Sequence, residues 1–271
     1  MPEVALSSGT SNFQDEGRGA PAIVLIHGMG LHLGLWDEHT RSLAGNFRVV
    51  RYDTLGHGAT VTPPGPWNFH QFARQLMELL EYLKVERPII VGFSLGGSIA
   101  QSFAIEYPKA LSGLVIVAAA CGRTLAEHRA VEARYQLVQA NGPSAVADAT
   151  MSRWFTLEFQ LRHPQIVDHW KQQLLLNSKE SYSKAYQLFL RTDEQLGDRI
   201  RTIGVPTLII TGDRDLGQTS KMARRMAARI KGSVTRILPN IAHMLPIEAG
   251  DELVCMISAF AQANAPPENS G

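Results

Sequence analysis

The sequence predicts a protein of the α/β class, in which helices flank a mostly parallel central sheet. Short apolar runs bounded by Gly and Pro alternate with longer amphipathic stretches, and this alternation is typical of strands and helices in a parallel sheet. The chain has 271 residues, which is long enough for one large domain of this class, with or without an insertion.

The composition is that of an ordinary globular protein. Hydrophobic residues make up 45% and charged residues 19% of the chain, which excludes a disordered protein. The formal net charge of +1 gives no indication of binding to nucleic acid or to an anionic membrane. The N-terminus lacks a signal-peptide pattern, and the longest strongly apolar run, residues 114–121, is far shorter than a bilayer span. We therefore expect a cytoplasmic protein whose partner is a small molecule; the sequence does not indicate its oligomeric state.

The two cysteines, Cys121 and Cys255, are predicted to be structural. They form no C-x-x-C pair and have no histidine at zinc-binding spacing. We expect both to be buried, reduced thiols, and we expect no metal site.

Six apolar runs predict the strands of the sheet, at residues 22–26, 47–52, 88–93, 111–118, 206–211 and 234–238. The intervening segments predict helices, among them residues 69–83, 95–107 and 218–230. In the second of these helices, apolar residues recur at helical spacing, at Leu95, Ile99, Phe103 and Tyr107. These side chains are expected to face the sheet.

The pattern changes between the fourth and fifth predicted strands. Roughly eighty residues pass there with helical periodicity and no convincing strand. The segment contains the aromatic residues Trp154, Phe155, Phe159 and Trp170. We predict a helical cap at residues 121–202 that packs over the carboxyl edge of a core formed by residues 1–120 and 203–271. The tail, residues 265–271, is expected to be frayed.

A nucleophile motif lies between the third strand and the second helix. Residues 92–96 read Gly-Phe-Ser-Leu-Gly, the G-x-S-x-G pattern of a sharp strand-to-helix turn that exposes a serine hydroxyl. Glycine is needed on both sides because the turn is strained and side chains there would strike its neighbours. Ser94 is therefore the predicted nucleophile.

A serine nucleophile needs a base and an acid that orients the base. The fifth strand runs into Gly-Asp-Arg-Asp at 212–215 and the sixth into Asn-Ile-Ala-His at 240–243, and both loops lie at the same edge of the sheet as Ser94. His243 is the predicted base. Asp213 and Asp215 compete for the acid role; we favour Asp215, which lies farther past the strand end, whereas Asp213 is placed to bond the amides of its own turn.

The remaining histidines fit the role of base less well. They lie in the predicted cap, on helices or in a loop, at His128, His163, His169, His39, His70 and His57.

The first strand is followed by His-Gly-Met-Gly at 27–30. A backbone N–H at this place and the N–H of the residue after the nucleophile form the oxyanion hole of a hydrolase. We predict the Met29 and Leu95 amides for this role, and expect His27 to hold the loop by hydrogen bonding.

The same glycines allow a dinucleotide-binding alternative. Gly28, Gly30 and Gly34 follow a strand and Asp53 ends the next one. The fingerprint is incomplete because Leu33 stands where glycine is required, and this reading explains neither the Ser94 motif nor the His243 loop. We therefore favour the hydrolase.

The motifs at 27–30, 52–60 (YDTLGHGAT), 92–97 (GFSLGG), 212–215 and 241–243 (IAH) resemble those of the α/β-hydrolase superfamily from about residue 20 to residue 262. Within it the chain most resembles 3-oxoadipate enol-lactonases, through RYDTLGHGAT and through Arg153-Trp154-Phe155-Thr156 with Phe159. The chain departs from the family pattern at Leu55, at Gly217-Gln218-Thr219 and at Ala249-Gly250.

The resemblance implies the α/β-hydrolase fold with a helical cap and a serine hydrolase that cleaves a small carboxylic ester or lactone through an acyl-enzyme, without a cofactor. It also implies that Arg153 and Trp154 line the acyl pocket and that Arg153 pairs a substrate carboxylate. Three other cap arginines are available for this pairing, at Arg123, Arg129 and Arg134. A C–C bond hydrolase or a perhydrolase with the same residues, and a slow-turnover receptor for a small molecule, stay open as alternatives.

Overall fold

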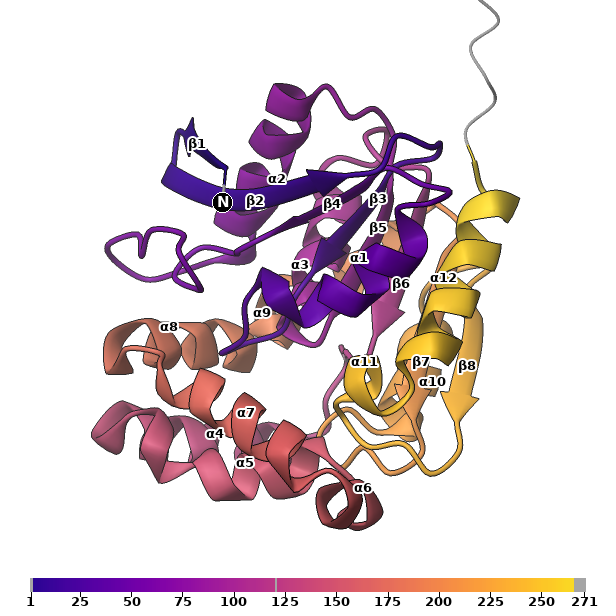
Figure 1. Cartoon of the computed structure of the whole chain (residues 1–271). Helices are drawn as coiled ribbons and strands as arrows, with labels where there is room; N and C mark the ends of the chain where they lie inside the picture. The colour runs from indigo at the N-terminus through magenta and orange to yellow at the C-terminus, as the bar shows by residue number, and fades with distance from the viewer. Residues whose placement is uncertain (1, 120, 266–271) are drawn as a thin grey trace, which may run out of the picture.

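The computed structural model describes residues 2–119 and 121–265, and within them an eight-stranded sheet forms the centre of the protein (Figure 1). The strand order is β1-β2-β4-β3-β5-β6-β7-β8. The pairs β1–β2 and β2–β4 are antiparallel, and the pairs β4–β3, β3–β5, β5–β6, β6–β7 and β7–β8 are parallel. The strands are β1 (Glu3–Leu6), β2 (Gly9–Glu16), β3 (Ile23–Ile26), β4 (Val49–Tyr52), β5 (Ile89–Phe93), β6 (Gly113–Val117), β7 (Thr207–Gly212) and β8 (Val234–Leu238).

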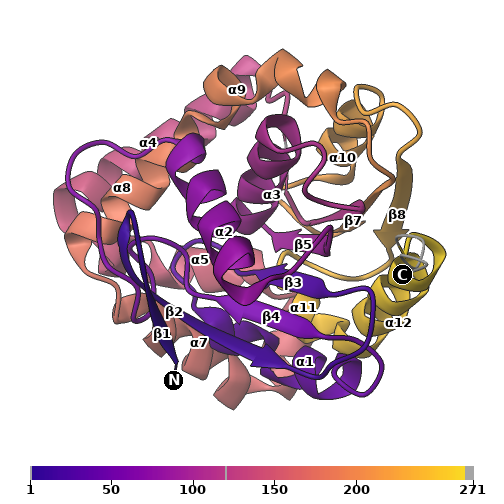
Figure 2. The same ribbon diagram turned by 90° about the horizontal axis from the view of Figure 1, so that it is seen from above.

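Helices cover both faces of the sheet. Helices α2, α3 and α10 lie on one face and α1 and α12 on the other (Figure 2). Because both faces are covered, every residue of β3, β5 and β6 is buried, and these strands read as continuous apolar runs. The bounds of the core helices are α1 (Asp37–Leu43), α2 (Phe69–Leu83), α3 (Leu95–Glu106), α10 (Ser220–Ala227), α11 (Leu245–Glu248) and α12 (Gly250–Ala263), with a 3₁₀ turn at Leu33–Trp36.

The segment between β6 and β7 is helical. Its helices are α4 (Leu125–Asn141), α5 (Ala147–Trp154), α6 (Leu157–Arg162), α7 (Pro164–Leu175), α8 (Lys179–Leu190) and α9 (Thr192–Gln195), with 3₁₀ turns at Pro143–Ala145 and Gly197–Thr202. Helices α4 to α8 form a layer beneath the sheet (Figure 1). Hydrogen bonds join the layer to core loops, among them those from Asn177 Nδ2 to the Gly30 carbonyl (2.9 Å) and from the Met244 N–H to the Trp154 carbonyl (2.7 Å).

The six predicted strands and the first predicted helix, 69–83, are confirmed, with strand ends that differ by up to two residues. The hairpin β1–β2 was not predicted. Its second strand, Gly9–Glu16, is rich in polar residues, and it joins the edge of the sheet by antiparallel pairing with β4. In the described part of the chain, no helix combines the length and apolar character needed to cross a membrane.

The prediction that both cysteines are buried is wrong for Cys255. Both thiols are free, and Cys121 is buried, but Cys255 is exposed because it lies on the outer side of α12. Of the tail expected to be frayed, residues 266–271 lie outside the described residues.

Candidate active site

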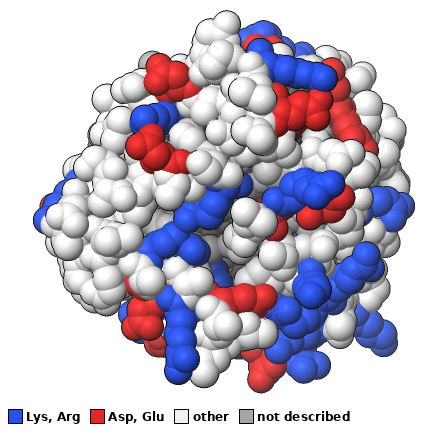
Figure 3. All heavy atoms as spheres, turned by 90° about the horizontal axis from the view of Figure 1, so that it is seen from below, with Lys and Arg blue, Asp and Glu red and all other residues white. Residues whose placement is uncertain are grey.

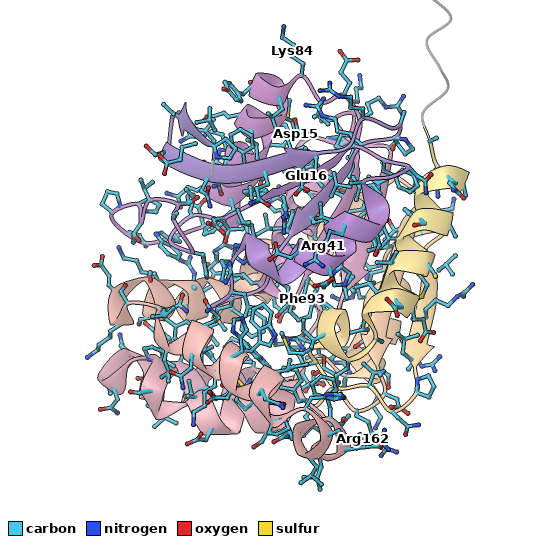
Figure 4. The ribbon with its side chains drawn as sticks, viewed as in Figure 1. Asp15, Glu16, Arg41, Lys84, Phe93 and Arg162 are labelled. Atoms are coloured by element: carbon cyan, nitrogen blue, oxygen red, sulfur yellow. The ribbon has the colours of Figure 1, made fainter. Side chains whose placement is uncertain are left out.

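Ser94 occupies a tight turn between β5 and α3. Its backbone has φ 54° and ψ −117°, a strained conformation for a residue with a side chain. The flanking glycines permit the turn, since a Cβ on Gly92 would lie 2.2 Å from the Gly96 carbonyl oxygen and one on Gly96 would lie 2.4 Å from the His27 carbonyl oxygen. Phe93, just before Ser94, lies between the sheet and the helical layer (Figure 4). The turn thus holds the serine at the carboxyl end of the sheet.

Ser94, His243 and Asp215 form a chain of hydrogen bonds. His243 Nε2 lies 3.1 Å from Ser94 Oγ, and His243 Nδ1 lies 2.7 Å from Asp215 Oδ2. The Asp215 side chain is fully buried, and its other oxygen accepts 2.8 Å hydrogen bonds from the Gly217 and Gln218 amides. Since an ionised carboxylate only accepts, Nδ1 carries the proton and Nε2 is left to accept from the serine hydroxyl.

Asp213 has a different environment. Its side chain is 39% exposed, and its Oδ1 accepts a 2.7 Å hydrogen bond from the Asn240 N–H. This bond ties the loop after β7 to the loop after β8. The structure therefore brings Asp215, and not Asp213, to the His243 ring.

The loop after β3 packs against the Ser94 turn. A Cβ on Gly28 would lie 3.2 Å from Ser94 Cβ, so the backbone passes close to the serine. Met29 lines the same cavity as Ser94, and Leu95 begins α3. Among the described residues, neither the Met29 nor the Leu95 amide has a hydrogen-bond acceptor. Both amides are available to a ligand.

Two buried histidines support this loop. His27 Nδ1 lies 2.8 Å from the Gly28 carbonyl oxygen, and its Nε2 accepts a 3.1 Å hydrogen bond from the Thr54 N–H, as expected for a structural role. His57 Nδ1 lies 3.0 Å from the Leu55 carbonyl oxygen. Burial lowers the pKa of both His27 and His57 to about 3.

Asp53 is a structural residue and not a ribose ligand. Its Oδ1 accepts from the Leu33 N–H (2.7 Å), and its Oδ2 accepts from Asn12 Nδ2 (2.7 Å) and the Ala59 N–H (2.9 Å). The carboxylate is buried and both oxygens are occupied, so the dinucleotide alternative lacks the acidic group that it requires.

A cavity of about 50 Å³ lies above Ser94. It is lined by Met29, Ser94, Arg134, Thr150, Arg153, Trp154, Tyr182, Tyr186, Phe189, Asp215, Gly217, Gln218 and His243. Arg153 and Trp154, which the sequence analysis placed in the pocket, are both present. Of the three alternative arginines only Arg134 lines it; Arg123 is paired with Asp193 and Arg129 is exposed.

The cavity contains two guanidinium groups that lack a carboxylate partner. Arg153 Nη2 donates a 2.9 Å hydrogen bond to Thr150 Oγ1. Burial lowers the pKa of Arg153, and the neighbouring charge of Arg134 acts in the same direction. No ion pair of the described residues includes either arginine. On the outer face of the helical layer, Lys and Arg side chains border a hollow (Figure 3). Among the described residues, both cationic side chains therefore line the cavity without a carboxylate counterion.

Glu248 connects the helical layer to the His243 loop. Its Oε2 accepts from the Ala242 N–H (2.6 Å), and its Oε1 accepts from the N–H and the hydroxyl of Thr156 (2.7 Å each). In the sequence, only the two residues after Glu248, Ala249 and Gly250, stand out as departures from the family pattern. Nothing in the sequence indicates that Glu248, five residues after His243, contacts Thr156.

Sequence reasoning missed several lining residues. Tyr182, Tyr186 and Phe189 follow one another at spacings of four and three on α8, so they share one helix face. This spacing could have indicated from the sequence that three aromatic side chains share one face of a cap helix. Gln218 lies three residues after Asp215, in the loop already noted as unusual, and its position there was a second signal.

A family model described as serine aminopeptidase, S33, matches residues 18–250, so the chain belongs to this family of hydrolases, within the α/β-hydrolase superfamily. The 3-oxoadipate enol-lactonase 2 of Acinetobacter baylyi is 28% identical over 246 residues, which cover 91% of this chain and 89% of that protein. The crystal structure of the enol-lactonase from Burkholderia xenovorans superposes with a TM-score of 0.86 at 26% identity, covering 96% of this chain and 99% of that one.

More distant proteins share the fold. A thermophilic esterase from Thermogutta terrifontis, solved with malate bound, superposes with a TM-score of 0.87 at 22% identity over 98% of this chain and 99% of that one. These likenesses confirm the predicted α/β-hydrolase fold and the resemblance to enol-lactonases.

The buried neutral histidines predict a loss of stability in acid. The folded protein keeps His57 neutral down to a pH of about 3, whereas the unfolded chain binds a proton below about 6.5. The free energy of unfolding should therefore fall as the pH falls from 6.5 towards 3, by up to about 1.4 kcal/mol per pH unit for each such histidine. Urea unfolding at pH 7 and at pH 5 measures this free energy. Between these two pH values, His57→Gln should lose less free energy of unfolding than the wild type. Equal losses would contradict a buried neutral imidazole.

Proposed function

We propose that this hydrolase cleaves a small carboxylic ester or lactone through a covalent acyl-enzyme, with Ser94 as nucleophile, His243 as general base and Asp215 as the acid that orients His243. The hydrogen-bond chain Ser94–His243–Asp215, at 3.1 Å and 2.7 Å, is the observation that carries the proposal. The ester or lactone specificity is supported by the enol-lactonases among the relatives.

The reaction follows from the hydrogen bonds. His243 Nε2 takes the hydroxyl proton while Ser94 Oγ attacks the carbonyl carbon, and the imidazolium then protonates the leaving group. Water activated by His243 releases the acid from the acyl-enzyme. Asp215 stabilises the imidazolium and, held by the Gly217 and Gln218 amides, keeps the ring in the required tautomer.

The negative oxygen of the tetrahedral intermediate is assigned to the Met29 and Leu95 N–H groups. Neither amide has an acceptor within the described part of the chain, and Gly28 brings this loop close to Ser94. Donors fixed in this way stabilise developing charge without having to reorient during the reaction.

We assign residues 121–202 to a cap that closes the site, and residues 1–120 and 203–271 to the core. Cap residues Arg153 and Trp154 line the cavity together with Ser94. Arg153 has no carboxylate among the groups that most affect its pKa, and a guanidinium matches a carboxylate in shape and charge. The substrate therefore carries a carboxylate that pairs with Arg153.

The nucleophile is tested by Ser94→Ala, which should leave the fold intact and lower kcat by roughly 10⁴-fold, because the covalent route is lost. His243→Ala should cost about as much, and the double variant should lose little more because the two residues act together. Steady-state kinetics on a 4-nitrophenyl ester and on an enol-lactone would measure this. A single variant that keeps a tenth of the wild-type rate, or additive losses in the double variant, would contradict the mechanism.

The acid is tested by comparing Asp215→Asn with Asp213→Asn. Only the first removes the carboxylate bonded to His243, so its kcat should fall by orders of magnitude, while Asp213→Asn should weaken the link to Asn240 and lower kcat far less. The opposite ranking would transfer the acid role to Asp213.

The carboxylate site is tested by Arg153→Gln. On a carboxylate-bearing lactone, kcat/KM should fall by roughly 10-fold to several hundred-fold, equivalent to about 1.5–3 kcal/mol for a charged hydrogen bond. A neutral analogue should barely change. Arg129→Gln, at an exposed cap arginine outside the cavity, is the matched control. Equal losses on both substrates would mean that Arg153 supports the cap and does not bind the carboxylate.

A further inference from the structure

His243 lies in a loop, at residues 239–244 between β8 and α11. Its ring is hydrogen-bonded to Asp215 and Ser94 and contacts the ring of Phe93, with 5.1 Å between the ring centroids. These contacts orient the ring, but they do not hold the backbone from which the side chain starts. A shift of about 1 Å at a reacting group can lower a rate by roughly 10²-fold, so this backbone needs anchors of its own.

Both neighbours of His243 in the chain are anchored through their backbone N–H groups. The Ala242 N–H donates a 2.6 Å hydrogen bond to Glu248 Oε2, and the Met244 N–H donates a 2.7 Å hydrogen bond to the Trp154 carbonyl. One anchor is therefore a side chain, and the other is the backbone at the end of α5 in the helical layer.

Glu248 extends its anchor to the same part of the helical layer. Its Oε1 accepts 2.7 Å hydrogen bonds from the N–H and from the hydroxyl of Thr156, and its own N–H donates a 2.9 Å hydrogen bond to the Met244 carbonyl. The backbone on either side of His243 is thus held, directly or through Glu248, by residues 154–156. This segment, which we call the docking segment, includes Trp154, and Trp154 lines the cavity above Ser94.

The carboxylate of Glu248 is specifically suited to this link. Among the described residues no cation pairs with it, and all three of the groups that its oxygens contact are hydrogen-bond donors. A hydrogen bond to an ionised acceptor is stronger than one between neutral groups. A glutamine would offer one oxygen and one NH₂ group, and the NH₂ group would face a donor.

We propose that Glu248 is a positioning residue for the base. It holds the backbone beside His243 against the docking segment, so that His243 is aligned with Ser94 only while this segment is packed on the loop. Glu248 does not line the cavity, and it acts through Ala242 and not on the substrate. The proposal rests on the proposed function, because it takes His243 as the general base.

The kinetic test uses Glu248→Gln and a pair of variants at Thr156, with 4-nitrophenyl acetate as substrate. In Glu248→Gln, kcat should fall by about 10-fold or more while KM changes by less than about threefold, because alignment of the base affects the chemical step. Thr156→Val removes only the hydroxyl bond to Glu248 and should lower kcat less, in the same direction. Thr156→Ser keeps the hydroxyl and should retain the wild-type kcat.

The alignment of the base can be observed directly by NMR. The Nδ1 proton of His243, bonded to Asp215, gives a low-field ¹H resonance that is identified by its loss in His243→Ala. This resonance should shift or broaden in Glu248→Gln and keep its position in Thr156→Ser. Glu252→Gln is the matched control, since Glu252 is an exposed glutamate of α12 with no hydrogen bond or ion pair among the described residues.

The outcomes separate a positioning role from a structural one. A lower Tm of Glu248→Gln with a wild-type kcat would overturn the proposal, because Glu248 would then only stabilise the fold. A wild-type kcat without a change in Tm, or a loss of kcat with an unshifted resonance, would overturn it as well. Hydrolysis of the acetate ester by the wild type, and its loss in Ser94→Ala, tests the proposed function separately from Glu248.

Discussion

The hydrogen bond between Asp215 and His243 is the interaction on which the rest of the site depends. It joins the loops after β7 and β8, and its position is determined by amides of the first loop, which hold the buried carboxylate in place. Asp213 links the same two loops nearer the surface, where its Oδ1 accepts a hydrogen bond from the Asn240 N–H. With both bonds present, the imidazole has one orientation, and that orientation points Nε2 at Ser94.

The same loop is tied to the helical layer. Glu248 accepts hydrogen bonds both from Ala242, next to His243, and from Thr156, just after α5. The Met244 amide adds a bond to the Trp154 carbonyl. The position of His243 and the position of the helical layer are therefore coupled through short, direct contacts, and a displacement of α5 would shift His243. Trp154 itself lines the cavity, so a molecule bound there would contact the segment that is bonded to the His243 loop.

The sequence predicted those parts of the site that are encoded in short segments. The Ser94 turn, the glycines around it and the order of the three loops are local patterns, and Asp215 could be preferred to Asp213 from its distance past the strand end. Contacts between distant segments left no such pattern: Arg134 of α4 lines the cavity, and Glu248 accepts hydrogen bonds from Ala242 and Thr156. Cys255 was misplaced because an apolar-looking residue on an amphipathic helix can fall on either face.

The charges of the cavity bear on how a substrate is admitted. At about 50 Å³, the cavity has room for only a few water molecules, which need about 10–15 Å³ each. Arg134 and Arg153 line this space, and the charge of Arg134 disfavours the charged form of Arg153. An entering carboxylate relieves that repulsion, and its attraction to the guanidinium groups increases as water is excluded. In the proposed mechanism, the free energy released on pairing would help to hold the proposed cap closed over the acyl-enzyme. A neutral ester would gain no such stabilisation, so closure itself would select for anionic substrates.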